Sequence, residues 1–305
     1  MEYQRIAVAI DFSDPSRHAL REAGRIAQRS GGKILAIHVA EEDAVQLFAR
    51  ELHGDPSILQ TALERQLGQW TTEVLPAEIT SEVRVIAGSP SRDITRQARE
   101  FHADLLVTGT RGNTHPNRRL GTLAGILVRQ AETPVLLVNP TASPPQSIVA
   151  CIDYSAASPL VMEHALAVAE KENLEIHIVH NEPPAGDYYA NLATASGLEP
   201  YSVAVLDPET LRRIDAGHLT RLKEFAASYQ HLAKPRRIQY SLTQDFTAAR
   251  GIIEFAANLA APLLILGTHG RTGLREALMG TTAERVLHQC PGSALLVRTQ
   301  PPTTP

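Results

Sequence analysis

The stretch Leu263-Leu264-Ile265-Leu266-Gly267-Thr268-His269-Gly270 decides the fold of this chain, together with the pair Gly280-Thr281 that follows it. The four apolar residues predict a buried strand, and the glycines predict a loop that leads into a helix. Glycine lets the backbone approach a ligand closely, and a helix N-terminus offers N–H groups and a positive dipole end to an anion. We therefore predict a phosphate-binding cradle, which is not a P-loop because no Gly-Lys-Ser/Thr sequence follows.

The same pattern occurs twice in the chain. Gly109 falls on Gly267 after a shift of 158 residues, and Ile6–Ser13 matches Ile148–Ser155 after a shift of 142. Two copies indicate a duplicated domain rather than a solenoid, and a length of 305 residues agrees with two domains. The repeated loop positions are Gly109, Gly112, Gly121 and Thr122 in the first copy and Gly267, Gly270, Gly280 and Thr281 in the second.

Each copy alternates short apolar runs with helix-type periodicity, which predicts a parallel sheet covered by helices on both faces. The fold class is therefore α/β, with two repeated doubly wound domains. In the first copy, strands are predicted at residues 6–10, 34–39, 82–86, 105–108 and 135–138. We place the first domain at 1–140, a linker at 141–146, the second domain at 147–298 and a flexible tail at 299–305.

The composition excludes several classes of partner. Lysine and arginine number 29 against 33 acidic residues, and this net charge of −4 argues against nucleic acid or a membrane surface as a partner. Cys151 and Cys290 are too few for a disulfide framework or a zinc site. No apolar run approaches a membrane span, and Asp11 interrupts the apolar stretch near the N-terminus, so no signal peptide is predicted. We expect a cytoplasmic protein without metal-binding residues.

A carboxylate follows the first strand of each copy, at Asp11 and Asp153. Ligands of open α/β sheets bind beyond the carboxyl ends of the strands. If strands one and four are neighbours, each carboxylate shares a pocket with a glycine loop, and that combination suits a nucleotide. Taken alone, each aspartate fits a helix cap equally well, but its recurrence beside the glycine loop favours ligand binding. His38 and His180 are predicted to be packed strand-end histidines, since no other histidine lies at ligand spacing from either.

The second loop is predicted to be the better formed of the two. Thr281-Thr282-Ala283-Glu284 has the capping-box pattern, in which Thr281 would cap the helix and Glu284 would bond back to it. The first copy lacks this glutamate, and its loop is one residue shorter. Asp14 before Pro15 likewise predicts the start of the chain's first helix, with Asp14 as the N-cap.

These motifs resemble those of the universal stress protein family in its tandem, two-domain form. The pattern is Gly-x2-Gly-x9-Gly-Ser/Thr after a strand, with an aspartate at the end of the first strand, and the resemblance covers nearly the whole chain. The segment Gly267–Leu287 is nearly a family consensus. The resemblance implies adenine-nucleotide-binding α/β domains, each with five parallel strands in the order 3-2-1-4-5.

The resemblance also implies which residues hold the ligand, which would be ATP (or AMP or ADP) with Mg²⁺ or Mn²⁺ carried by its phosphates. The aspartate and a second-strand residue would hold the nucleoside, and the glycines and hydroxyl residues would hold ribose and phosphates. In the second, stronger site these are Asp153, Asn181, Gly267, Gly270, Gly280, Thr281 and Thr282. In the first, weaker site they are Asp11, Val39, Gly109, Gly112, Gly121 and Thr122. Asn181 replaces the family's valine, and Gly88-Ser89-Pro90 becomes Phe246-Thr247-Ala248 in the second copy.

We expect a nucleotide-binding regulatory protein of the stress response, in which ATP is a sensor ligand and no residue is assigned a catalytic role. One alternative is an enzyme, either a slow ATPase or an adenylating enzyme, and another is a dimerising interaction module with vestigial pockets. Self-association is left open, either as a pseudo-dimer within the chain or as a homodimer. Co-purified nucleotide would distinguish a binding protein from an interaction module, and linear ATP turnover would identify an enzyme.

Overall fold

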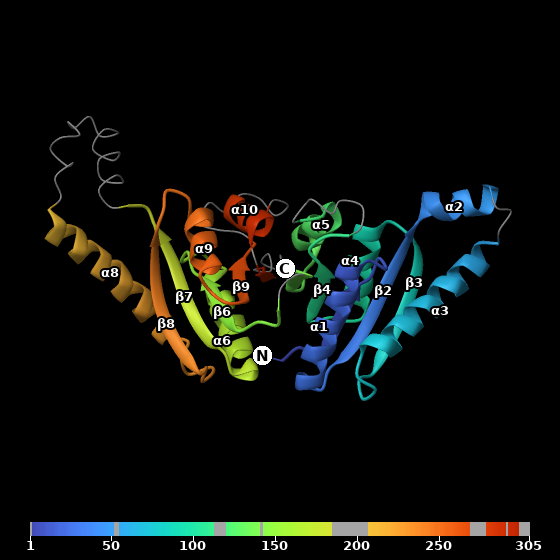
Figure 1. Cartoon of the computed structure of the whole chain (residues 1–305), viewed down its shortest axis with the longest axis horizontal. Coiled ribbons are helices and arrows are strands. Elements are labelled where there is room, and N and C mark those ends of the chain that lie inside the picture. Colours follow the sequence, from blue (N-terminus) through green and yellow to red (C-terminus); the bar gives the residue numbers. More distant parts are fainter. Residues whose placement is uncertain are drawn as a thin grey trace, which may run out of the picture. The chain divides into compact units, whose positions relative to one another are not determined.

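The computed structural model describes residues 2–51, 55–112, 120–140, 143–184, 207–268, 279–290 and 292–298, in which strands and helices alternate along the chain (Figure 1). The first repeat contains β1 (Arg5–Ala9), α1 (Asp14–Ser30), β2 (Lys33–Glu41), α2 (Glu42–Glu51), α3 (Pro56–Val74), β3 (Ser81–Gly88), α4 (Pro90–Glu100), β4 (Leu105–Gly109), α5 (Thr122–Gln130) and β5 (Val135–Val138). The second contains β6 (Ser147–Cys151), α6 (Ser158–Glu172), β7 (Glu175–Glu182), α8 (Pro208–Ala227), β8 (Arg237–Gln244), α9 (Ala248–Ala257), β9 (Pro262–Gly267), α10 (Thr281–Gln289) and β10 (Ser293–Val297).

The chain forms two compact units, and the first has a parallel sheet in the order β3-β2-β1-β4-β5. The register places Ile6 of β1 opposite Ile34 of β2 and Leu105 of β4. The last strand of the chain, β10, is grouped with this unit and pairs antiparallel with β5, with Leu295 opposite Leu136. The α/β class and the strand order predicted for this repeat are confirmed.

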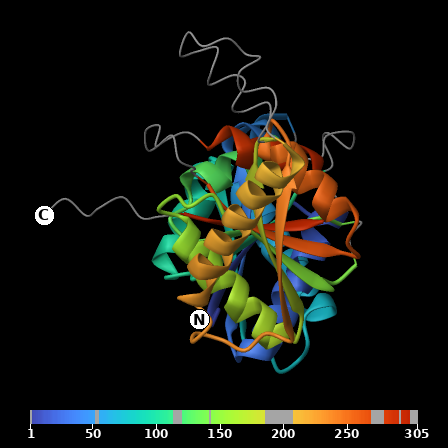
Figure 2. The ribbon, with the colours of Figure 1, turned by 90° about the vertical axis from the view of Figure 1, so that its left-hand side faces the viewer.

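The second unit repeats this order as β8-β7-β6-β9, again with parallel pairing. In Figure 2 its golden helix α8 lies in front of the sheet, near the yellow-green helix α6. The predicted α/β repeat is therefore present in both halves of the chain. The exact domain limits, including the linker at 141–146 and the tail at 299–305, stay a prediction.

The direction of each chain crossing sets which helices share a face of the sheet. In the first unit the chain steps from β1 to β2 to β3, returns to β4 and then steps the other way to β5. Because such crossings are right-handed, α1 and α3 cover one face and α4 and α5 the other, and the helices within each pair contact one another. This strand order leaves the carboxyl ends of β1 and β4 side by side.

The core consists of the central strands, which are apolar on both faces as expected of a parallel sheet between two helical layers. Ile6, Leu105 and Leu106 in the first unit and Ile148 and Leu264 in the second have no exposed surface. Among the described residues, no helix is both long and apolar enough to cross a bilayer.

One local prediction of the first repeat needs correction, and one helix was missed. Helix α1 is capped by Ser13, not Asp14, because the Ser13 hydroxyl accepts the N–H of Ser16 while Asp14 already lies in the first turn. Helix α2 was not predicted from the sequence. Gly31 ends α1 in the left-handed conformation with φ of 68°, and Asp55 is the N-cap of α3.

Candidate functional site

Each unit has a cavity at the carboxyl ends of its central strands, of about 530 Å³ in the first and about 280 Å³ in the second. All six residues predicted for the first site line the first cavity, namely Asp11, Val39, Gly109, Gly112, Gly121 and Thr122. Six of those predicted for the second site line the second, namely Asp153, Asn181, Gly267, Gly280, Thr281 and Thr282. Gly270 lies outside the described residues. The structure thus gathers residues far apart in the sequence around two cavities, and their role in binding stays a prediction.

The strand-end aspartates brace the turn that follows each first strand. Oδ1 of Asp11 accepts the N–H of Ser13 at 3.0 Å, and Oδ1 of Asp153 accepts the N–H of Ser155 at 2.9 Å. Neither aspartate is the N-cap of the next helix, since Ser13 caps α1 and Ala157 precedes α6. A helix-capping role therefore does not account for the carboxylates, and both remain in the cavity walls.

The residue after each aspartate has the same unusual backbone conformation. Phe12 and Tyr154 both have φ of 59°, a left-handed value that bulky residues seldom adopt. Each ring packs against the second-strand histidine of its repeat, with a centroid separation of 4.6 Å from His38 and from His180. This kink directs the aromatic ring into the protein and turns the chain between the aspartate and the following helix.

Two glycines of the first unit, Gly109 and Gly112, have no room for a side chain. A Cβ on Gly112 would collide with Oδ2 of Asp11, and one on Gly109 would lie 2.9 Å from Cβ of Pro15. The backbone closes the loop by a hydrogen bond from the Gly121 N–H to the Thr110 carbonyl at 2.7 Å. The second unit has the equivalent bond, from Gly280 to Thr268, also at 2.7 Å. Both loops therefore bring a helix start to the carboxyl end of the fourth strand of their repeat.

The predicted capping box at the start of α10 is wrong. Helix α10 begins at Thr281, its N-cap is Gly280, and no side chain bonds to the cap. Helix α5 starts in the same way, with Gly121 as the N-cap and no side-chain bond. The first-turn N–H groups of both helices, which have no partner within a helix, are consequently not claimed by a capping side chain. One of the two arguments for a better-formed second site is therefore lost.

His38 and His180 lie within β2 and β7 and not at their ends, and both are held by the backbone. Nδ1 of His38 lies 2.8 Å from the Ile10 carbonyl, and Nδ1 of His180 lies 2.6 Å from the Ile152 carbonyl. Burial lowers the pKa of His38 by more than the Ile10 bond and the charge of Asp11 raise it. These contacts support the prediction of packed histidines, although His180 also reaches the lining of the second cavity.

Sequence reasoning missed one serine in each repeat that lines the cavity of that repeat. Ser16 and Ser158 are related by the shift of 142 residues that relates the two aspartates. The Ser158 hydroxyl donates to Oδ1 of Asp153 at 3.0 Å, whereas the Ser16 hydroxyl donates to the Ser13 carbonyl at 2.9 Å. Their recurrence at the repeat distance was the available signal.

The comparisons with known proteins agree with this architecture. The family model described as the universal stress protein family matches residues 2–139 and 145–298. The chain belongs to the universal stress protein family. It is 28% identical to "Universal stress protein E" of Photorhabdus laumondii, over 93% of this chain and 91% of the relative. The protein of that name from Escherichia coli K12 is 24% identical, over 99% of this chain and 96% of its own length.

A solved structure shows the same tandem fold. The universal stress protein from Archaeoglobus fulgidus DSM 4304 matches with a TM-score of 0.67 at 16% identity, over 98% of this chain and 99% of that chain. At this identity the likeness concerns the fold alone. Together with the family match, it confirms that the duplication inferred from the sequence corresponds to a tandem pair of universal stress protein domains.

Proposed function

We propose that this protein binds adenine nucleotides in both cavities and acts as a regulatory protein of the stress response in the cytoplasm. One observation carries the proposal: in the first unit, the carboxylate of Asp11 and the glycine-capped start of α5 face the same cavity, and Gly112 has no room for a Cβ between them. A negative group and an anion-binding helix start suit the two ends of one ligand, a nucleoside and its phosphates.

The residues present fit such a ligand. The first-turn N–H groups of α5 and α10, with the hydroxyls of Thr122 and Thr281, would bind the phosphates, because a helix start with uncapped N–H groups favours an anion. The carboxylates of Asp11 and Asp153 would accept hydrogen bonds from ribose hydroxyls or from a base amine. The ligand would be ATP, ADP or AMP, and a Mg²⁺ or Mn²⁺ ion would arrive bound to the phosphates.

We expect binding without efficient catalysis. Backbone N–H groups at a fixed helix start stabilise phosphates in the ground state, and uniform binding of this kind does not lower a chemical barrier.

The test is mass spectrometry of small molecules released from the purified, denatured protein, followed by calorimetric titration with ATP. Adenine nucleotide in the released fraction and saturable heat support the proposal. If folded protein releases no adenine nucleotide and gives no saturable heat, the proposal is contradicted and an interaction module with vestigial pockets is favoured. Linear turnover near the ordinary enzyme median of about 10 per second would instead identify an ATPase. Light scattering with and without ATP would test for a homodimer.

A further inference from the structure

The start of α4, directly after the turn from β3, forms one wall of the first cavity, where Pro90, Ser91 and Ile94 line it. The start of α9, after the turn from β8, contributes Ala248 and Ile252 to the second cavity. The two turns have different sequences, so the way each is held in place can be compared within one chain.

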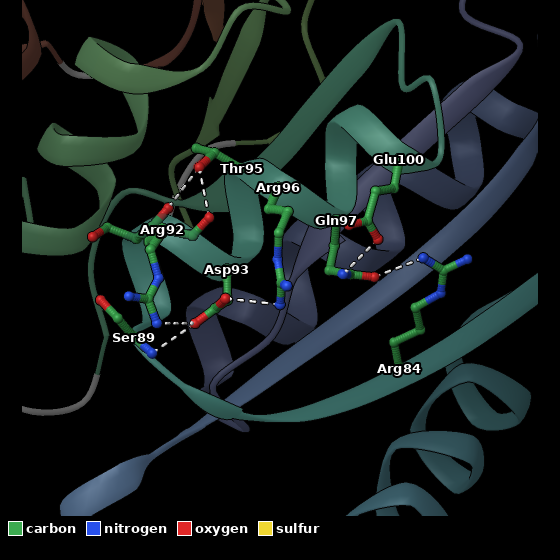
Figure 3. Close-up of polar contacts among 9 residues, drawn as sticks. Arg84, Ser89, Arg92, Asp93, Thr95, Arg96, Gln97 and Glu100 are labelled. Atoms are coloured by element: carbon green, nitrogen blue, oxygen red, sulfur yellow. Dashed lines mark hydrogen bonds and ion pairs between the residues drawn. The ribbon is translucent and has the colours of Figure 1, made fainter.

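In the first unit this turn is fastened by a buried carboxylate. Asp93 is only 4% exposed, and its Oδ2 accepts the N–H of Ser89, the N-cap of α4, at 2.7 Å (Figure 3). Nη2 of Arg96 lies 2.9 Å from Oδ1, and Nη2 of Arg92 lies 3.3 Å from Oδ2. Burial raises the pKa of the Asp93 carboxyl, but the Ser89 bond and the two arginines outweigh burial and hold the pKa below its ordinary value. Asp93 therefore carries its charge at neutral pH.

Gly88 makes room for this carboxylate. A Cβ at Gly88 would collide with Oδ2 of Asp93. The two positions are thus coupled, because a buried carboxylate at 93 requires glycine at 88. The same coupling predicts that glycine is no longer required at position 88 once the carboxylate at position 93 is lost.

The second unit carries its carboxylate on the strand instead. The shift of 158 residues that relates the glycine loops places Asp93 on Gly251, and the strand register places Gly88 on Asp245. Oδ1 of Asp245 accepts the N–H of Thr247, the N-cap of α9, at 2.8 Å, and Nε of Arg250 lies 3.3 Å from Oδ2 of Asp245.

A different side chain fills the space beside Gly251. A Cβ there would collide with Oδ1 of Asn181 and would lie 2.7 Å from Oγ1 of Thr243. The Asn181 Oδ1 accepts the Thr243 hydroxyl at 2.9 Å, and its Nδ2 donates to the carbonyl of Asp245 at 2.9 Å. Asn181 therefore reaches from β7 to the end of β8 and ties down the second turn.

We infer that Asp93 in the first unit and Asn181 in the second are positioning residues, each of which fixes the β–α turn that leads into the helix lining its own nucleotide cavity. Asp93 works from the helix through its carboxylate, and Asn181 works from the neighbouring strand through the carbonyl of Asp245. This inference rests on the proposed function for its consequence in binding, but the fastening of each turn is a property of the protein alone. It also accounts for asparagine at the family's valine position, since its side chain holds the turn and leaves the backbone of β7 available to a ligand.

The first experiment measures hydrogen exchange in the nucleotide-free protein. Asp93→Ala should speed exchange of the Ser89 N–H by about tenfold or more, the factor given by loss of one hydrogen bond to a charged group. Asp93→Asn keeps an acceptor oxygen and should restore most of the protection. Arg99→Ala, an exposed change on the same helix, is the matched control. Unchanged exchange in Asp93→Ala would overturn the inference whether or not the protein binds nucleotide.

The second experiment measures ATP affinity at one site at a time, with the other blocked by Gly280→Val or Gly121→Val. Asp93→Ala should weaken ATP binding at the first site by about tenfold. The apparent affinity falls with the fraction of molecules in which the start of α4 is in its binding position, and loss of Asp93 lowers that fraction. Asn181→Val should weaken only the second site. Equal effects on both sites, or loosened exchange with unchanged affinity, would refute the positioning role while leaving nucleotide binding intact.

The second unit keeps the test decisive if Asp93→Ala folds poorly. Asn181→Val removes the bond to the Asp245 carbonyl and should speed exchange of the Thr247 N–H, which Oδ1 of Asp245 accepts, by about fivefold, the factor given by loss of one neutral hydrogen bond. Unchanged exchange of the Thr247 N–H would contradict the positioning role of Asn181.

Discussion

The second residue of the cradle helix should set the difference in phosphate affinity between the two sites. Thr282 in α10 and Leu123 in α5 occupy this position, and each lines its cavity. Both helices start at a threonine after a glycine cap, so capping does not distinguish them. The hydroxyl of Thr282 is an additional donor to a phosphate that the first site lacks.

The magnitude follows from one hydrogen bond to a charged group, which is worth roughly 1.5–3 kcal/mol. Because Thr282 is exposed and its hydroxyl is already solvated, we take the lower end, about 1.5 kcal/mol, or about tenfold in affinity. Thr282→Leu should therefore weaken ATP binding at the second site by about tenfold. Leu123→Thr should have the opposite effect and strengthen ATP binding at the first site.

The assay is calorimetric titration of each variant with ATP and with adenosine. Adenosine has no phosphate, so its affinity should stay unchanged in both variants and serves as the internal control. An equal loss of adenosine and ATP affinity would show that the threonine shapes the cavity instead of binding phosphate. Unchanged ATP affinity in both variants would refute the reasoning outright.

Three further outcomes are expected. Gly112→Ala should weaken ATP binding at the first site by about tenfold in calorimetry, since its Cβ would displace the Asp11 carboxylate and its bond. Burial lowers the pKa of His164 to about 4, so as the pH falls below about 6.5 the unfolded chain binds a proton at this residue and the folded chain does not. The free energy of unfolding, measured with urea, should therefore be about 2 kcal/mol lower at pH 5 than at pH 7. His164→Gln should reduce this pH dependence. Gly68→Ala, in mid-helix with no atom near its Cβ, should raise the free energy of unfolding by about 0.5–1 kcal/mol, measured by urea unfolding.

The fold could be predicted from the sequence because its signals are local and occur twice. The strands are short apolar runs, and the glycine positions are fixed by close backbone packing that admits no Cβ. Asp11 and Asp153 were found because both follow directly from a strand end. Ser16 and Ser158 were missed because serine near a helix start usually indicates only a cap.

Predictions that depend on the path of a loop were less successful. Thr281 and Glu284 match the capping-box pattern, but Gly280 has the extended cap conformation, with φ of −59° and ψ of 141°, so Thr281 falls one position inside the helix. The Asn181 contact with Thr243 joins residues 62 positions apart, and it becomes visible only when the strand register is known.

The two domains share their backbone and differ in the side chains that support it. Both have the kink at φ of 59° after the aspartate and the closing bond of 2.7 Å across the glycine loop. The phosphate recognition that we propose would depend on N–H groups of this shared backbone, so we expect both domains to be capable of it. The supporting groups differ, with Asp93 in one wall and Asn181 in the other. A mutation in either residue should therefore affect one site alone, whereas differences in affinity between the intact sites should arise mainly where a side chain itself reaches the ligand, as at Leu123 and Thr282.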